Sequence, residues 1–194
     1  MTLALFDVDG TLLLTHDPTA NRALIDVVDP SLADDAVDHI DAKGRTALWI
    51  ATQLLGRAPD EGWCARYEKR YAELLGDTSH WRSPDGAVET LHALERRGVQ
   101  LALLTGNAER IARLRMNRLG LSRFFPHGQG AFGCESADRD ELLRRALERA
   151  RVRASATVEI GDTPRDESSA QEVGIRSIRV DELGSFTELL ELVA

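Results

Sequence analysis

The chain has 194 residues, with 24 basic and 32 acidic side chains and a formal net charge of −8. This acidic balance argues against nucleic acid or an anionic membrane as the main partner, and it suits a protein that acts on small molecules. The length fits one ordinary domain, or a compact domain that carries a modest insertion.

Two cysteines, Cys64 and Cys134, lie far apart and have no histidine or cysteine neighbours at metal-ligand spacing. This pattern predicts neither a disulfide framework nor a zinc site. The N-terminal stretch lacks a basic leader, and no segment approaches the ~18–20 apolar residues of a membrane span. We therefore expect a cytoplasmic protein with no membrane partner. The sequence does not indicate an oligomeric state.

The first predicted element is a buried strand at 3–8, which is short and apolar and runs into Gly10. The next segment, 15–83, has helical patterns at 20–28, 44–55 and 60–75 and no convincing strand. Strands and helices then alternate to the end: strands at 99–104, 129–132, 157–160 and 175–180, and helices at 84–97, 107–119, 139–149 and 164–173. Alternation of apolar strands with helices predicts a parallel sheet covered on both faces.

These patterns predict an α/β fold: a Rossmann-like, three-layer core with a mostly parallel five-stranded sheet and an inserted all-helical cap domain. The core would comprise residues 1–14 and 84–194, and the cap residues 15–83. The insertion leaves the sheet just after the first strand, where ligands bind in open α/β sheets. We therefore expect the cap to cover the site.

Polar motifs follow three of the predicted strands. They are DVDGT (Asp7 to Thr11), LLTGN (Leu103 to Asn107) and GDTPRD (Gly161 to Asp166). Carboxylates gathered at one sheet edge repel one another, by ~4 kcal/mol per pair at 4 Å and an effective dielectric near 20. Oxygen ligands without nearby histidine or cysteine favour a hard cation, and Mg²⁺ is the expected cofactor.

In this order and at these strand ends, the three motifs resemble those of the haloacid dehalogenase superfamily, specifically its phosphatases with a helical cap of the phosphoglycolate phosphatase-like branch. The resemblance implies that Asp7 is the nucleophile and Asp9 the general acid and base. Two residues spaced in this way at a strand end can both reach one reacting centre.

The resemblance also implies roles for the other motif residues. Thr105, Gly106 and Asn107 would bind the phosphoryl group, and Asn107 could instead, or also, cap the following helix. Asp7, Asp162 and the backbone carbonyl of Asp9 would hold the metal. Asp166 would orient a metal-bound water, although an acidic residue is also common in the first turn of a helix.

Relatives place a lysine between the second and third motifs, but here both lysines, Lys43 and Lys69, lie inside the insertion. Arg139 is the candidate to replace it as a phosphate ligand. The alternative is a surface arginine paired with Asp138 or Glu135, and these two acids could also be the groups that position Arg139.

Within the insertion, Gly44, Arg45 and Thr46 form the one stretch with site-like chemistry, and in relatives a Gly-x-Thr near this point lines the substrate side of the cap. The next residue here is Ala47, where relatives often have aspartate, so the substrate assignment stays open. Alternatively, Thr46 opens a helix and Arg45 is solvated.

The resulting hypothesis is a Mg²⁺-dependent phosphomonoester hydrolase that acts on a small phosphorylated metabolite through an aspartyl-phosphate. A phosphomutase of the same superfamily keeps both aspartates and is the alternative, followed by a non-catalytic binding module. A haloacid dehalogenase is disfavoured because members of that class lack the second aspartate.

Overall fold

The computed structural model describes residues 2–193 and is built around a five-stranded parallel sheet with strand order β3-β2-β1-β4-β5. The strands are β1 (Leu3–Phe6), β2 (Gln100–Thr105), β3 (Ala131–Phe132), β4 (Thr157–Gly161) and β5 (Arg176–Arg179). The predicted α/β class and parallel sheet are confirmed.

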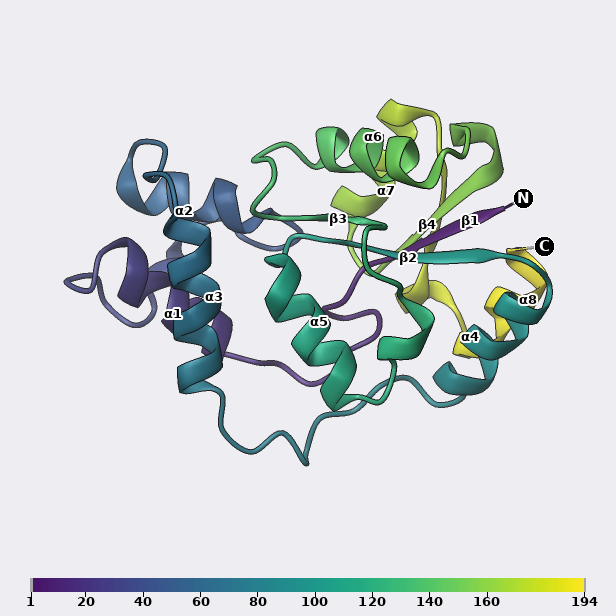
Figure 1. Ribbon diagram of the computed structural model, residues 1–194, viewed down its shortest axis with the longest axis horizontal. Coiled ribbons are helices and arrows are strands. Elements are labelled where there is room, and N and C mark those ends of the chain that lie inside the picture. The colour runs from purple at the N-terminus through teal and green to yellow at the C-terminus, as the bar shows by residue number, and fades with distance from the viewer. Residues whose placement is uncertain (1, 194) are drawn as a thin grey trace.

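Helices form a layer on each face of this sheet (Figure 1). The helices are α1 (Thr19–Val28), α2 (Ala47–Leu55), α3 (Trp63–Leu74), α4 (Ala87–Arg96), α5 (Glu109–Arg118), α6 (Arg139–Ala150), α7 (Pro164–Val173) and the short α8 (Leu189–Leu192). Helices α6 and α7 cover one face, and α4, α5 and α8 cover the other. Side chains of β1 alternate between the two apolar cores, with Leu3 and Leu5 on the first side and Ala4 and Phe6 on the second.

Helices α1, α2 and α3 form a separate group beside the sheet, on the side away from both chain termini (Figure 1). We call it the α1–α3 group. Its apolar side chains pack together and against Ala108 and Ile111, where α5 begins. A membrane-spanning helix, with its long apolar run, is not found within residues 2–193.

The start of α2 is bonded to the backbone of the sheet layer. The amide of Ala47 donates to Gly106 O at 2.8 Å, and that of Leu48 donates to Gly133 O at 2.9 Å. A Cβ at Gly106 would lie 2.2 Å from the carbonyl oxygen of Arg45, so this close approach requires glycine. The α1–α3 group is therefore seated directly on the loop that follows β2.

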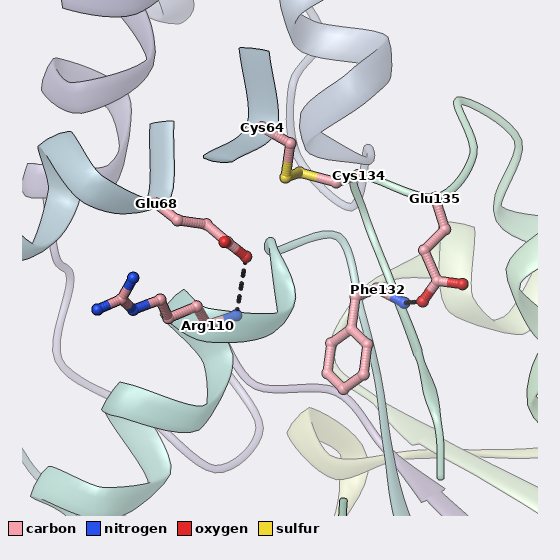
Figure 2. Close-up of a disulfide and its surroundings, with 6 residues drawn as sticks. All are labelled: Cys64, Glu68, Arg110, Phe132, Cys134 and Glu135. Carbon is pink, nitrogen blue, oxygen red and sulfur yellow. Dashed lines mark hydrogen bonds between the residues drawn. A yellow bond between two sulfur atoms is a disulfide. The ribbon is translucent and has the colours of Figure 1, made fainter. Parts of the chain in front are cut away.

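Cys64 and Cys134 form a disulfide, with their Cα atoms 6.1 Å apart, which corrects the expectation drawn from the sequence (Figure 2). Cys64 lies in α3 and Cys134 lies two residues beyond β3, so 70 positions of sequence separate partners that the fold brings together. Beside the disulfide, Glu68 of α3 accepts a hydrogen bond from the amide of Arg110 at 3.0 Å. The α1–α3 group is thus covalently joined to the strand layer.

Candidate active site

The carboxylates predicted from the first and third motifs meet at one edge of the sheet. Asp7 follows β1, Asp162 follows β4 and Asp166 lies in the first turn of α7. One carboxylate oxygen from each lies within 4.8 Å of the others. These oxygens come from three different points along the chain, and this geometry suits a hard divalent cation.

Asp166 is fixed in place by the start of α7. Its Oδ2 accepts hydrogen bonds from the amide and the hydroxyl of Thr163, both at 2.8 Å, and the Thr163 side chain in turn caps the helix. This capping box satisfies the helix end and leaves Oδ1 of Asp166 facing Arg139 Nη2, which lies 2.5 Å away. The expectation that Asp166 is an acidic residue of the first helical turn is confirmed, and its role beside a metal-bound water stays a prediction.

Without a bound cation, the environment of the clustered carboxylates disfavours their charged forms. Burial raises the pKa of Asp7 well above its usual range, Asp166 and Asp9 raise it further, and Arg139 opposes the shift. Burial also raises the pKa of Asp162, against the lowering effect of Lys43. A bound cation would reverse these shifts, so the donor set fits the predicted Mg²⁺ chemically.

Gly10 makes room for this cluster. Its φ of +72° favours glycine, and a Cβ at this position would lie 2.4 Å from the carboxylate of Asp162. The glycine of the first motif therefore lets the β1 loop approach the β4 loop.

The second motif surrounds the Asp9 carboxylate. The Asn107 side-chain amide donates to Asp9 Oδ2 at 2.6 Å and to Thr105 Oγ1 at 2.9 Å. Thr105 ends β2 and is fully buried. Ala108, and not Asn107, occupies the N-cap position of α5, so the capping alternative for Asn107 is wrong and its side chain lies against Asp9 instead.

Arg139, the first residue of α6, is buried beneath the acids. Its Nη2 lies 2.5 Å from Asp166 Oδ1, 3.0 Å from Glu159 Oε1 and 4.0 Å from Asp7 Oδ2. Within residues 2–193, its Nε and Nη1 have no hydrogen-bond partner. The alternative of a surface arginine is wrong.

The acids considered as partners of Arg139 have other roles. Asp138 caps α6 by accepting from the amide of Asp140 at 2.9 Å, and Glu135 pairs with Arg149 at 2.5 Å. The group that positions Arg139 from below is Glu159 of β4, which is fully buried. Burial raises the pKa of Glu159 to about 7, although Arg139 opposes this shift. A charged residue inside an otherwise apolar strand was the signal in the sequence that could have revealed it.

The Lys43 to Thr46 stretch lies over the acids. Lys43 Nζ lies 3.5 Å from Asp162 Oδ2, so a lysine from the inserted segment does reach the site. Gly44 passes close to Thr163, and the Arg45 guanidinium stacks on Trp49 at 4.3 Å from the ring centroid. Thr46 caps α2 by accepting from the amide of Trp49 at 3.1 Å, as the helix-opening alternative expected.

Three residues outside the sequence motifs form a hydrogen-bonded network beside Asp9: Arg115, Asp17 and Tyr71. The buried guanidinium of Arg115 in α5 donates to Asp9, to Asn107 and to Asp17, and its Nε lies 3.3 Å from the hydroxyl of Tyr71 in α3. Arg115 shares the inward face of α5 with Ile111, Ala112 and Met116. A cation on the apolar face of a predicted helix was the available signal.

A cavity of about 490 Å³ connects these features. Its polar floor includes Asp7, Asp9, Thr105, Gly106, Asn107, Arg139 and Asp162. Its opposite wall comes from the α1–α3 group and the segments between its helices, and includes Leu24, Val37, Lys43, Gly44, Arg45, Ile50 and Tyr67. The cavity thus has a floor of polar and charged side chains, and its opposite wall combines apolar side chains with the two cations Lys43 and Arg45.

Comparison with known proteins agrees with this architecture. The family model of the haloacid dehalogenase-like hydrolases matches residues 4–180. A phosphoglycolate phosphatase of Xanthomonas campestris is 30% identical over 179 residues, which cover 90% of this chain and 80% of that protein. A phosphoglycolate phosphatase of Agrobacterium fabrum is 28% identical, covering 92% of this chain and 79% of that protein.

Among solved structures, CbbY from Rhodobacter sphaeroides in complex with phosphate superposes with a TM-score of 0.73 at 21% identity, covering 97% of this chain and 96% of that one. This likeness shows a shared fold. The chain belongs to the haloacid dehalogenase-like hydrolase family and is a hydrolase of that family.

Proposed function

We propose that this protein is a Mg²⁺-dependent phosphomonoester hydrolase that acts on a small phosphorylated metabolite through an aspartyl-phosphate intermediate. The observation that carries the proposal is the convergence of the Asp7, Asp162 and Asp166 oxygens within 4.8 Å, beside a buried arginine and next to a cavity of about 490 Å³. The relatives named phosphoglycolate phosphatase support the same class of reaction.

The proposed chemistry uses two carboxylates. An oxygen of Asp7 attacks phosphorus, the ester P–O bond breaks, and Asp9 gives a proton to the leaving oxygen, so that an alcohol departs. Water then attacks phosphorus while Asp9 takes its proton, and the bond between Asp7 and phosphorus breaks. Inorganic phosphate leaves and both aspartates return to their starting state.

The cation would be held by Asp7, Asp162 and the backbone carbonyl of Asp9, while Asp166 orients a water beside it. Mg²⁺, when bound, supplies positive charge that offsets the acids and the phosphoryl oxygens. Asp166 is given the orienting role because its Oδ2 is occupied by Thr163 and its Oδ1 faces Arg139.

The phosphoryl oxygens would be bound by Thr105, the backbone at Gly106 and Asn107, and Arg139. Two buried nitrogens of Arg139 have no partner among residues 2–193, and unpaired buried donors are costly unless a ligand satisfies them. Positive groups already aimed at the reacting phosphoryl group are the main means of catalysis in phosphoryl transfer.

The substrate would carry a second anionic group. Lys43, which is paired with Asp162, and Arg45 border the cavity on the side of the inserted segment, and Gly44 and Thr46 hold that stretch in place. A small phosphorylated acid of the phosphoglycolate type matches these two cations, and the cavity has ample room for it. We keep residues 15–83 as the proposed cap, residues 1–14 and 84–194 as the proposed core, and a cytoplasmic location as a prediction.

The test is a phosphate-release screen over several dozen phosphate esters, with Mg²⁺ and with EDTA. We expect release that requires Mg²⁺ and favours small phosphorylated acids. An isomerised product in place of free phosphate would instead support a phosphomutase. Cation binding without turnover of any ester would support a non-catalytic module and contradict the proposal.

A further inference from the structure

Arg115 occupies an unusual place for a permanently charged side chain. It lies on α5 with 2% of its side chain exposed, and its guanidinium remains protonated at all relevant pH values. Asp17, whose side chain is equally buried, lies 2.9 Å from Nη2 and by itself supplies one counter-charge. A second carboxylate is therefore not needed to neutralise this arginine.

Arg115 nevertheless makes a further set of hydrogen bonds toward the cavity. Its Nη1 donates to Asp9 Oδ1 at 2.9 Å, to Asp9 Oδ2 at 2.8 Å and to Asn107 Oδ1 at 2.8 Å. Asn107 in turn donates to Asp9 Oδ2. Both oxygens of the Asp9 carboxylate thus accept hydrogen bonds, from Arg115 in α5 and from Asn107 just before that helix.

Without these donors, little would fix the Asp9 side chain. About half of it (53%) is exposed, and an exposed carboxylate changes rotamer freely. Proton transfer in a transition state requires the carboxylate to be within hydrogen-bond reach of the leaving oxygen, and small misplacements cost large factors in rate.

The other end of Arg115 reaches the α1–α3 group. Asp17 lies just before α1, and its Oδ1 accepts from the amide of Thr19 in the first turn of that helix at 3.0 Å. Tyr71 of α3 donates its hydroxyl proton to Asp17 Oδ2 at 2.7 Å and accepts from Arg115 Nε at 3.3 Å. The guanidinium therefore contacts Asp9 on one side and two residues attached to the helical group on the other.

We propose that Arg115 is a positioning residue that holds the Asp9 carboxylate in the orientation needed for proton transfer and ties this orientation to the seating of the α1–α3 group through Asp17 and Tyr71. This inference rests on the proposed phosphatase function and adds to it a residue that touches neither the phosphoryl group nor the cation. Lysine is a poor replacement for this arginine, because its single nitrogen cannot reproduce the separate contacts of Nη1 with Asp9 and of Nη2 with Asp17.

The test compares two esters that differ in leaving group. p-Nitrophenyl phosphate releases a stable phenolate that needs little protonation, whereas phosphoglycolate releases an alkoxide that needs a proton from Asp9. Because Asp9 also serves as the base when the aspartyl-phosphate is hydrolysed, whichever ester formed it, the esters are compared by kcat/KM, which reports only the steps up to departure of the leaving group. For Arg115→Met we expect kcat/KM on phosphoglycolate to fall about 100-fold, the lower end of the effect of general acid catalysis, and kcat/KM on p-nitrophenyl phosphate to fall less than about 3-fold. We expect Arg115→Lys to resemble Arg115→Met.

Two further variants keep the result interpretable. Arg115→Met leaves Asp17 buried without its cation, and this could unfold the protein. The double variant Arg115→Met with Asp17→Asn removes both charges, and the same kinetics are measured on it if the single variant does not fold. Arg118→Met makes the same substitution three residues later on the exposed side of α5, and we expect wild-type kinetics from it.

Each possible outcome either supports or overturns the inference about Arg115. A selective loss on phosphoglycolate in a folded Arg115 variant supports the inference. An equal loss of kcat/KM on both esters, together with a lower melting temperature, means that Arg115 is only structural and overturns the inference, as does wild-type kcat/KM on both. A wild-type enzyme that hydrolyses neither these two esters nor any other ester of the screen overturns the proposed function, and the inference fails with it.

Discussion

The Nη2 atom of Arg139 donates to Oε1 of Glu159 at 3.0 Å, and both side chains are almost completely buried. Resemblance to the family implies a lysine in the place that Arg139 takes. The guanidinium has more donors than an ammonium group, and Glu159 and Asp166 hold one end of it while its other two nitrogens have no hydrogen-bond partner in the described part of the chain.

Arg139→Met should lower kcat by about 100- to 1000-fold, because a positive group aimed at the phosphoryl oxygens is lost. It should also destabilise the fold by about 3–5 kcal/mol, because Glu159 is left buried without its cation. Steady-state kinetics and urea unfolding measure the two effects.

A double variant separates these two effects. Arg139→Met combined with Glu159→Leu should recover most of the stability and none of the activity, and Arg144→Met on the exposed side of α6 should change neither. Recovery of activity in the double variant would show that Arg139 acts only on the fold.

Glu159 should make stability depend on pH. Burial raises its pKa from 4.5 to about 7 in the folded protein, so the folded state binds more protons than the unfolded state between these values. Its contribution to stability is fully present below the unfolded pKa and is lost as the pH rises through about 7. The loss amounts to about 3 kcal/mol at most.

Urea unfolding in EDTA from about pH 4 to about pH 8 would measure this contribution, with values chosen to span the two pKa values. Glu159→Gln should flatten the dependence of unfolding free energy on pH. Identical slopes for the variant and the wild type would contradict the assignment.

The Cys64–Cys134 disulfide should contribute about 2–4 kcal/mol to stability, because it closes a long loop in the unfolded chain. Cys64→Ser with Cys134→Ser should lower the urea midpoint under oxidising conditions. A thiol reductant should bring the wild type to the same midpoint and leave the double variant unchanged. Two free thiols in the unreduced, unfolded protein would contradict the pairing.

Mg²⁺ should stabilise the folded protein, because it relieves the repulsion among Asp7, Asp162 and Asp166. At about 100 times Kd, the expected gain is about 2.7 kcal/mol. Melting temperature measured against Mg²⁺ concentration tests this, with Asp162→Asn as the variant that should respond far less. Equal responses would place the cation elsewhere.

The sequence was sufficient to predict the sheet, the helices on both faces and the acids at the strand ends, because these depend on local periodicity and on the meeting of parallel strand ends. The short helix α8 was not predicted because a four-residue helix has too little periodicity to be recognised.

The sequence was insufficient where distant segments meet. Cys64 and Cys134 lie next to each other only because α3 packs beside the loop after β3, and Lys43 reaches Asp162 only because its segment is seated on the sheet edge. The roles of Arg115 and Glu159 depend on which partners the buried charges find, and spacing along the chain carries no such information.

The measurement that tests the central claim most directly is to trap the covalent intermediate. The enzyme is quenched in acid while it turns over a labelled phosphate ester, and the labelled residue is located by peptide fragmentation. The account predicts a phosphoryl group on Asp7, absent from an inactive Asp7→Asn variant. An active wild-type enzyme that carries the label on another residue, or an Asp7→Asn variant that still releases phosphate, would contradict it.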